Sequence, residues 1–225
     1  MRFSHVSLNL DCLLDIDVAR VVLAFIVLLF SLTVHESAHA WTADRLGDPT
    51  ARLLGRVSLN PLVHADLIGT VLFPIVAFAT GAPLIGWAKP VPVNVRRLDH
   101  PRRDYVLVAA AGPASNLALA FLASLLLHVV PISPVRVGEP NVTAPLASML
   151  GGAVQINVWL AVFNMIPIPP LDGGNVLLGL VPPPLARVLD RVRPYGFLIL
   201  YALMLTGGLE YIVLPPYNIV RAVLP

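Results

Sequence analysis

Six long stretches without Asp, Glu, Lys or Arg divide the 225-residue chain. They are Val21–Val34, Leu67–Ala88, Tyr105–Val135, Pro140–Leu171, Gly173–Ala186 and Pro194–Leu209. A helix needs about 20 apolar residues to cross the hydrocarbon core of a bilayer. The first stretch reaches that length if its helix runs from Val18 to Trp41, and the third and fourth exceed it. The pattern predicts an all-α polytopic membrane protein, a bundle of about five to six transmembrane or re-entrant helices.

Two of the six stretches carry helix breakers, which argues against simple crossings. Leu67–Ala88 is interrupted by Pro74, Gly81 and Pro83, and Gly173–Ala186 is short and runs into three consecutive prolines. Irregular backbone survives at membrane depth only beside protein or water, so both are candidates for re-entrant elements. Residues 86–104 alternate prolines with valines, which disfavours helix. We therefore expect a short extended or β segment there at the cytoplasmic side, with a plain basic linker as the alternative.

The composition supports a membrane protein, and the basic residues suggest its orientation. The chain is 57% hydrophobic and 12% charged, with a mean hydropathy of +0.80. Eight basic residues lie within residues 43–104 and three within 182–194, whereas residues 132–147 hold one arginine and one glutamate. The positive-inside rule places the first two segments in the cytoplasm and the third outside. We expect a multi-pass protein of the cell (plasma) membrane whose partner is the lipid bilayer and not nucleic acid.

The single cysteine and the charges near the N-terminus provide two further constraints. Cys12 is the single cysteine, which excludes an internal disulfide and a cysteine-based metal site. Acidic residues precede the first apolar run, where a cleaved signal peptide would carry positive charge. We therefore expect residues 1–225 to form a single membrane-embedded domain.

The first apolar stretch leads into the pattern H-E-x-x-H, formed by His35, Glu36 and His39. A helix advances about 100° per residue, so the two histidines lie about 40° apart on one face. Two imidazoles in this arrangement can bind one metal ion, with the glutamate beside them as a general base. The alternative is that the three groups only hydrogen-bond to one another within a helix bundle. His35 lies about 26 Å along the helix axis from Val18, which places the site near the cytoplasmic boundary.

A catalytic zinc site needs a third protein ligand, and Asp172 is the best candidate. It is a lone carboxylate between two uncharged stretches, with prolines just before it and two glycines just after it. The alternative is that Asp172 caps the following helix, although both roles can coexist through different oxygens. The other residues of suitable type are His5, His64, His100, His128, Glu139 and Glu210.

His64 and Asp66 form a second polar group within an apolar region. They can bind a second metal ion or gate a channel. We favour a structural role, in which they form a local turn with Asn60 and Pro61 at the start of an interfacial helix.

Three motifs together resemble the site-2 protease family of intramembrane zinc metalloproteases. They are HESAH at residues 35–39, AGPASN at residues 111–116 and NMIPIPPLDGG at residues 164–174. The chain is most similar to short prokaryotic members, which lack PDZ and CBS domains. The resemblance implies one Zn²⁺ per chain held by His35, His39 and Asp172, with Glu36 as the catalytic base. It also implies roles for Asn116 and Asn164 in the active-site region.

The expected function is therefore an intramembrane zinc metalloendopeptidase that cleaves transmembrane protein substrates in or near their transmembrane segments. Asn116 or Asn164 can donate a hydrogen bond to the oxyanion, with plain interhelical hydrogen bonding as the alternative for each. A metal- or proton-linked transporter and a catalytically inactive protease-like binding protein are the competing classes. The sequence indicates neither the substrate nor the oligomeric state.

Overall fold

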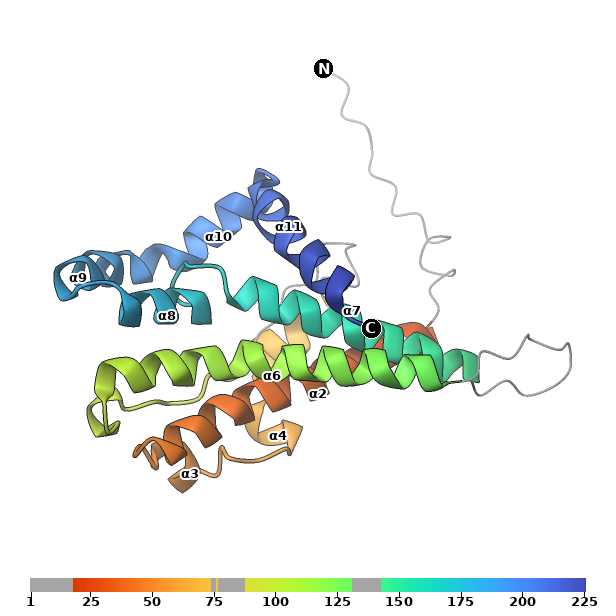
Figure 1. Ribbon diagram of the computed structural model, residues 1–225, viewed down its shortest axis with the longest axis horizontal. Coiled ribbons are helices and arrows are strands. Elements are labelled where there is room, and N and C mark those ends of the chain that lie inside the picture. Colours follow the sequence, from red (N-terminus) through yellow and green to blue (C-terminus); the bar gives the residue numbers. More distant parts are fainter. Residues whose placement is uncertain (1–17, 74–75, 77–87, 131–142) are drawn as a thin grey trace, which may run out of the picture.

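The computed structural model describes residues 18–73, 76, 88–130 and 143–225, and within these residues all regular structure is helical (Figure 1). The three longest helices are α2 (Val18–Arg45), α6 (Pro101–Val129) and α7 (Thr143–Asn164). The shorter helices are α3 (Thr50–Leu53), α4 (Pro61–His64), α8 (Asp172–Leu180), α9 (Pro183–Val192), α10 (Gly196–Leu205) and α11 (Gly208–Val223). A π-helical turn, η1 (Leu67–Leu72), and two 3₁₀ turns, η2 (Val95–Arg97) and η3 (Arg193–Tyr195), complete the described elements.

Three described helices are long and apolar enough to cross a membrane: α2 from Val21 onward, α6 and α7. A fourth crossing is available if residues 183–205 and helix α11, bent by 86° at their junction, form one span. Large apolar side chains on these helices are open to the surroundings, such as Phe30, which is 51% exposed. A soluble protein would bury such contiguous apolar surface, whereas a lipid-facing helix presents it. The prediction of an all-helical membrane protein is confirmed, but the number of five to six helices is not.

Helix α6 lies between α2 on one side and α7 and α8 on the other (Figure 1). The buried small residues Ala109, Gly112 and Ala120 of α6 allow this close packing. The main apolar cluster joins α6 to α7 through Ala120, Ala123, Leu150, Val154 and Val158, and α11 covers it with Tyr217 and Val220. The chain therefore brings α8, which is distant in sequence from α2, to the same central helix.

Helix α2 begins at Val18 as predicted and continues four residues beyond Trp41. It ends in a Schellman-type motif, in which Asp48 N–H donates to Ala43 C=O at 2.9 Å and Gly47 N–H donates to Asp44 C=O at 3.4 Å. Gly47 has φ of +101°, a conformation that favours glycine. The local sequence thus ends the helix ten residues after His35, and the segment that follows leaves the direction of α2.

Prolines begin two helices where the sequence pattern suggested surface segments. Helix α6 starts at Pro101, before the uncharged stretch, and α9 starts at Pro183, within the basic segment 182–194 for which we predicted only a cytoplasmic position. Proline is well suited to the first turn of a helix because the N–H it lacks would have no helical partner there. Neither α9 nor α11 was predicted as a helix from the sequence.

The segment after the predicted re-entrant stretch is held without regular structure. Residues 88–94 form neither helix nor strand, so the predicted β segment is not confirmed, and η2 follows at Val95. Asn94 N–H donates to Asp48 Oδ2 at 2.6 Å, and Lys89 N–H donates to His64 C=O at 2.7 Å. Of the predicted re-entrant element Leu67–Ala88, most residues lie outside the described part of the chain.

Asp48 is the buried link between the end of α2 and residues 88–94, and we predict that replacing it loosens this segment. Its side chain accepts hydrogen bonds from Asn94 N–H and, at 3.1 Å, from Thr50 N–H. In Asp48→Ala these donors lose their acceptor, at a cost of about 2 kcal/mol in local stability. Trypsin cleavage at the exposed Arg96 should then accelerate roughly 30-fold.

The control for this experiment is Asp44→Ala, which removes an exposed ion pair to Arg52 with an N–O distance of 2.7 Å. Such pairs contribute little to stability. Equal acceleration of trypsin cleavage in both variants would show that Asp48 does not hold the segment.

Candidate metal centre

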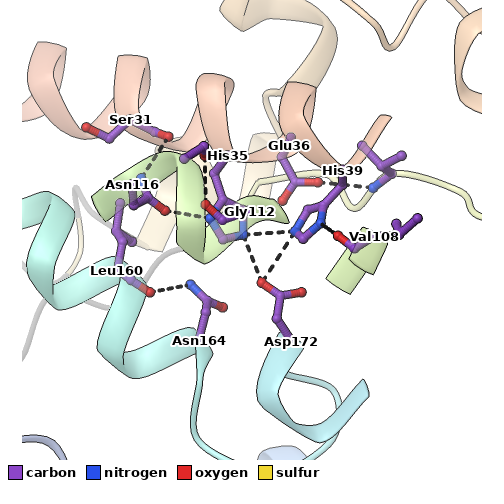
Figure 2. Close-up of polar contacts among 12 residues, drawn as sticks. Ser31, His35, Glu36, His39, Val108, Gly112, Asn116, Leu160, Asn164 and Asp172 are labelled. Atoms are coloured by element: carbon purple, nitrogen blue, oxygen red, sulfur yellow. Dashed lines mark hydrogen bonds and ion pairs between the residues drawn. The ribbon is translucent and has the colours of Figure 1, made fainter. Parts of the chain in front are cut away.

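Three residues from distant parts of the chain meet at one point in the helix bundle. The Nε2 atoms of His35 and His39 lie 3.1 Å apart, and they lie 3.0 and 3.3 Å from Oδ2 of Asp172 (Figure 2). Both histidines are buried, with 4% and 8% of their surface exposed. These residues form the only cluster of at least three possible His, Cys, Asp or Glu ligands among the described residues.

The helix α2 and the start of α8 position these side chains. His35 and His39 lie one turn apart on α2, with ring centroids 4.7 Å apart and planes at 84°. Asp172 is the first residue of α8. The start of this helix packs closely against the backbone of Met165 in the preceding segment. A Cβ at Gly173 would lie 2.2 Å from Met165 C=O, so this approach requires glycine.

The second nitrogen of each imidazole bonds to α6, and this determines the tautomer. His39 Nδ1 lies 2.7 Å from Val108 C=O, which can only accept, so Nδ1 carries the proton. His35 Nδ1 lies 2.6 Å from Asn116 Oδ1, while Asn116 Nδ2 donates to Ser31 C=O at 3.3 Å. In the neutral rings, both Nε2 atoms are therefore bare lone-pair donors directed toward Asp172.

This donor set fits a divalent cation such as Zn²⁺. Two imidazole lone pairs and a carboxylate oxygen at about 3 Å from one another repel in a buried site unless a positive charge lies among them. Two histidines and one carboxylate are a known ligand set of catalytic zinc, and the hydrogen bonds to Nδ1 are the usual outer support for such ligands.

Gly112 of α6 keeps the space beside the donors open. A Cβ at this position would lie 2.4 Å from His39 Nε2 and 2.6 Å from His35 Nε2. Any side chain here would therefore enter the region that the three donors face. The close approach of the two histidines thus explains why the AGPASN motif has a glycine at position 112, which the sequence alone did not reveal.

A buried polar network behind His35 contains the interhelical hydrogen bonds that were the alternative for Asn116, together with Ser31 and Asn157, which were not predicted. Asn157 of α7 accepts a hydrogen bond from Asn116 Nδ2 at 2.8 Å and donates to Ser31 Oγ at 2.9 Å. Ser31, Asn116 and Asn157 are each at most 2% exposed, and they come from three different helices. The available signal was the isolated asparagine in an apolar span, where a polar side chain needs a partner on another helix.

The structure places the other predicted site residues as follows. Glu36 lies beside His39, and its Oε2 accepts a hydrogen bond from Val91 N–H at 3.1 Å (Figure 2). The Asn164 amide donates to Leu160 C=O of its own helix at 2.9 Å, at the end of α7 near Asp172 (Figure 2). The side chain of Asp172 makes no capping bond, since Leu171 is the N-cap of α8.

The remaining candidate ligands do not join the cluster. His64 is buried and hydrogen-bonds to Ser58 C=O at 2.9 Å, while Asn60 caps α4 and Asp66 caps η1. This agrees with the structural role that we favoured for them. His100 lies beside Asp104 and His128 beside Ser124 C=O. His5 and Glu139 lie outside the described residues.

Comparisons with known proteins identify similar sequences. The model of a family described as Peptidase family M50 matches residues 23–136 and 131–206. A Bacillus subtilis protein named "Putative zinc metalloprotease YwhC" is 38% identical over 193 residues, which cover 86% of this chain and 84% of the relative. "Putative zinc metalloprotease Rip2" of Mycolicibacterium smegmatis is 31% identical over 182 residues, covering 81% of this chain and 66% of the relative. No solved structure matches the chain significantly.

We predict that Gly112→Ala prevents zinc binding while leaving the helix bundle folded. The added methyl group would lie closer to both Nε2 atoms than any non-bonded carbon can. Metal analysis of the purified variant should show zinc content near zero. Gly151→Ala is the matched control, because a Cβ there meets nothing within 4 Å, and it should keep its zinc. Full zinc content in Gly112→Ala would contradict this description of the site.

We predict that Asn157→Leu accelerates zinc loss although Asn157 touches no ligand. Without Asn157, Asn116 loses one of the two acceptors that keep its oxygen directed toward His35. Outer partners of metal ligands typically contribute 10–100-fold to affinity, so roughly a tenfold faster loss of zinc to a chelator is expected. Gln155→Leu, an exposed position of the same helix, should lose zinc at the parent rate. Equal rates in both variants would exclude an orienting role for Asn157.

Proposed function

This chain belongs to Peptidase family M50, and on that premise we propose that it is an intramembrane zinc endopeptidase that cleaves other membrane proteins in or near their transmembrane segments. The family match confirms the resemblance predicted from the three motifs and makes the chain a zinc metalloprotease. Neither the transporter nor the inactive binding protein is favoured by these relatives. The observation that carries the proposal is the meeting of His35, His39 and Asp172 between apolar helices long enough to cross a bilayer.

We assign the metal ligands to His35, His39 and Asp172, each contributing one atom to a single Zn²⁺. When bound, Zn²⁺ supplies Lewis acidity, which activates water at neutral pH and polarises a peptide carbonyl. The chain's own contribution is to orient both imidazoles through the contacts of their Nδ1 atoms with Val108 and Asn116. Asn116 is therefore a positioning residue in this proposal, because its oxygen and its amide group are both engaged by the protein.

Glu36 is the proposed general base. Val91 N–H holds its Oε2, and none of the described residues bonds to Oε1. The second oxygen is thus available to take a proton from the attacking water and return it to the leaving amine nitrogen. Asn164, at the end of α7 near Asp172, is the remaining candidate for a contact with the substrate backbone (Figure 2).

The arrangement of basic residues supports an active site near the cytoplasmic side of the cell membrane. Helix α3, the start of α6 and α9, which carry or adjoin the two basic clusters, lie at the same end of the molecule (Figure 1). The positive-inside rule requires the clusters to share one side. Arg45 ends α2 ten residues after His35, or about 15 Å along the helix. The centre therefore lies within the half of the bundle nearer to the basic end. In this proposal, residues 1–225 act as one membrane-embedded domain.

Glu36→Gln provides the test of this function. The amide cannot accept the proton, so cleavage of a model transmembrane substrate in proteoliposomes should fall by roughly 10²–10⁴-fold. Zinc content should equal that of the parent, because Glu36 is not among the ligands. Glu210→Gln, on α11, should retain full activity. Cleavage by Glu36→Gln at the parent rate, or no zinc-dependent cleavage by the parent, would contradict the proposal.

A further inference from the structure

A groove between the start of α6 and the end of α8 combines positive charge with an apolar wall. Its volume is about 430 Å³, and its lining residues are Arg102, Arg103, Val106, Leu107, Gly179 and Leu180. Residues four apart in a helix lie on the same side. Val106 and Leu107 therefore lie on the same side as Arg102 and Arg103, about 6 Å further along the axis of α6. We call the two arginines the cationic row and the two apolar residues the apolar row. The groove is thus charged at one end and apolar at the other.

Neither arginine of the groove forms an ion pair with a described carboxylate. The acidic residue that follows them, Asp104, is turned into the protein and is 2% exposed. Its Oδ2 accepts the backbone N–H of His100 at 2.7 Å and lies 3.7 Å from the His100 ring. Asp104 is therefore occupied at the helix start, and the other nearby acid, Asp99, has its carboxylate beside Gly47, where a Cβ would lie 2.7 Å from Asp99 Oδ1. Among the described residues, the two guanidinium groups thus have no ion-pair partner.

Gly179 keeps the floor of the groove free of side-chain atoms. A Cβ at this position would lie 2.2 Å from Val106 Cγ2 and 3.2 Å from Arg102 C=O. The end of α8 can therefore lie against α6 only because residue 179 has no side chain. Beyond this contact, Leu107 and Leu180 are 43% and 67% exposed and give the groove its apolar wall.

The groove lies where a membrane-spanning helix meets the basic end of the molecule. Helix α6 is a candidate span that begins at Pro101, directly before the two arginines. Helix α9 follows Leu180 closely and presents apolar Leu185 and Val188 together with exposed Arg187 and Arg191. A short helix with apolar and basic faces is typical of the interface between headgroups and acyl chains. The cationic row is therefore expected at headgroup level and the apolar row at acyl-chain level.

We propose that this groove binds an anionic phospholipid, with its phosphate on Arg102 and Arg103 and an acyl chain along Val106, Leu107 and Leu180. A guanidinium group matches phosphate through two parallel hydrogen bonds. Basic pockets between membrane helices on the cytoplasmic side suit anionic headgroups. A free phosphate would use the cationic row alone, and a zwitterionic lipid would bring its own ammonium toward the arginines. An anionic lipid satisfies both parts of the groove.

The test compares the affinities of phosphatidylglycerol and phosphatidylcholine for the full chain purified in detergent, using native mass spectrometry. The variant R102Q/R103Q removes the cationic row. The matched control R96Q/R97Q removes the same charge from the exposed arginines of η2, which do not line the groove. The parent and the control should prefer phosphatidylglycerol, whereas R102Q/R103Q should bind it roughly tenfold or more weakly. Zinc content equal to that of the parent verifies that each variant is folded.

Three results would overturn the proposal. Equal loss of phosphatidylglycerol binding in both double variants would show a general effect of surface charge. Complete competition by inorganic phosphate would show a simple anion site that does not use the apolar row. Unchanged lipid binding by R102Q/R103Q, together with weaker binding of a transmembrane peptide with an acidic flank, would assign the groove to a protein segment.

Discussion

The surrounding structure depends on one constraint, which is the close approach of three electron-pair donors. They are buried among apolar helices and are directed at one point. The Nε2 atoms of His35 and His39 and Oδ2 of Asp172 lie within 3.3 Å of one another. Water cannot screen such a group in a low-dielectric site, so a positive charge among the donors is needed, and a divalent cation supplies it. This requirement explains the one-turn spacing of the histidines, the missing side chain at Gly112 and the tight start of α8.

Burying the histidines brings further polar groups into the bundle, and those that contact the two rings are themselves hydrogen-bonded. His39 uses a backbone carbonyl of α6, while His35 uses Asn116, which is itself bonded to Ser31 and Asn157. A buried amide without partners would cost several kcal/mol in an apolar environment. The network removes that cost and fixes the positions of α2, α6 and α7 relative to one another. The same bonds that stabilise the bundle therefore orient His35.

The surface segment beside the centre contributes to chemistry through its backbone. Residues 88–94 have no regular hydrogen-bonded structure of their own, so their N–H groups are free to bond elsewhere. Asn94 N–H bonds to Asp48, just after α2, and Val91 N–H bonds to Glu36, on α2 itself. A segment of this kind can hold the Glu36 carboxylate in place without contributing a side chain. Alternating proline and valine favours this arrangement because it prevents the segment from becoming helical.

The sequence by itself determined the helical membrane class, the first helix from Val18, and the identities of the residues that meet at the centre. Apolar runs, helical periodicity and the H-E-x-x-H spacing are local properties that need no knowledge of the fold. Only the tertiary structure decided that Asp172 reaches the histidines, that Asn157 supports His35 and that Gly112 keeps the space beside them open. It also showed that the prolines near residue 183 begin a helix, because proline suits a first turn as well as it breaks an interior. These features depend on contacts between residues up to 137 positions apart, which no local pattern encodes.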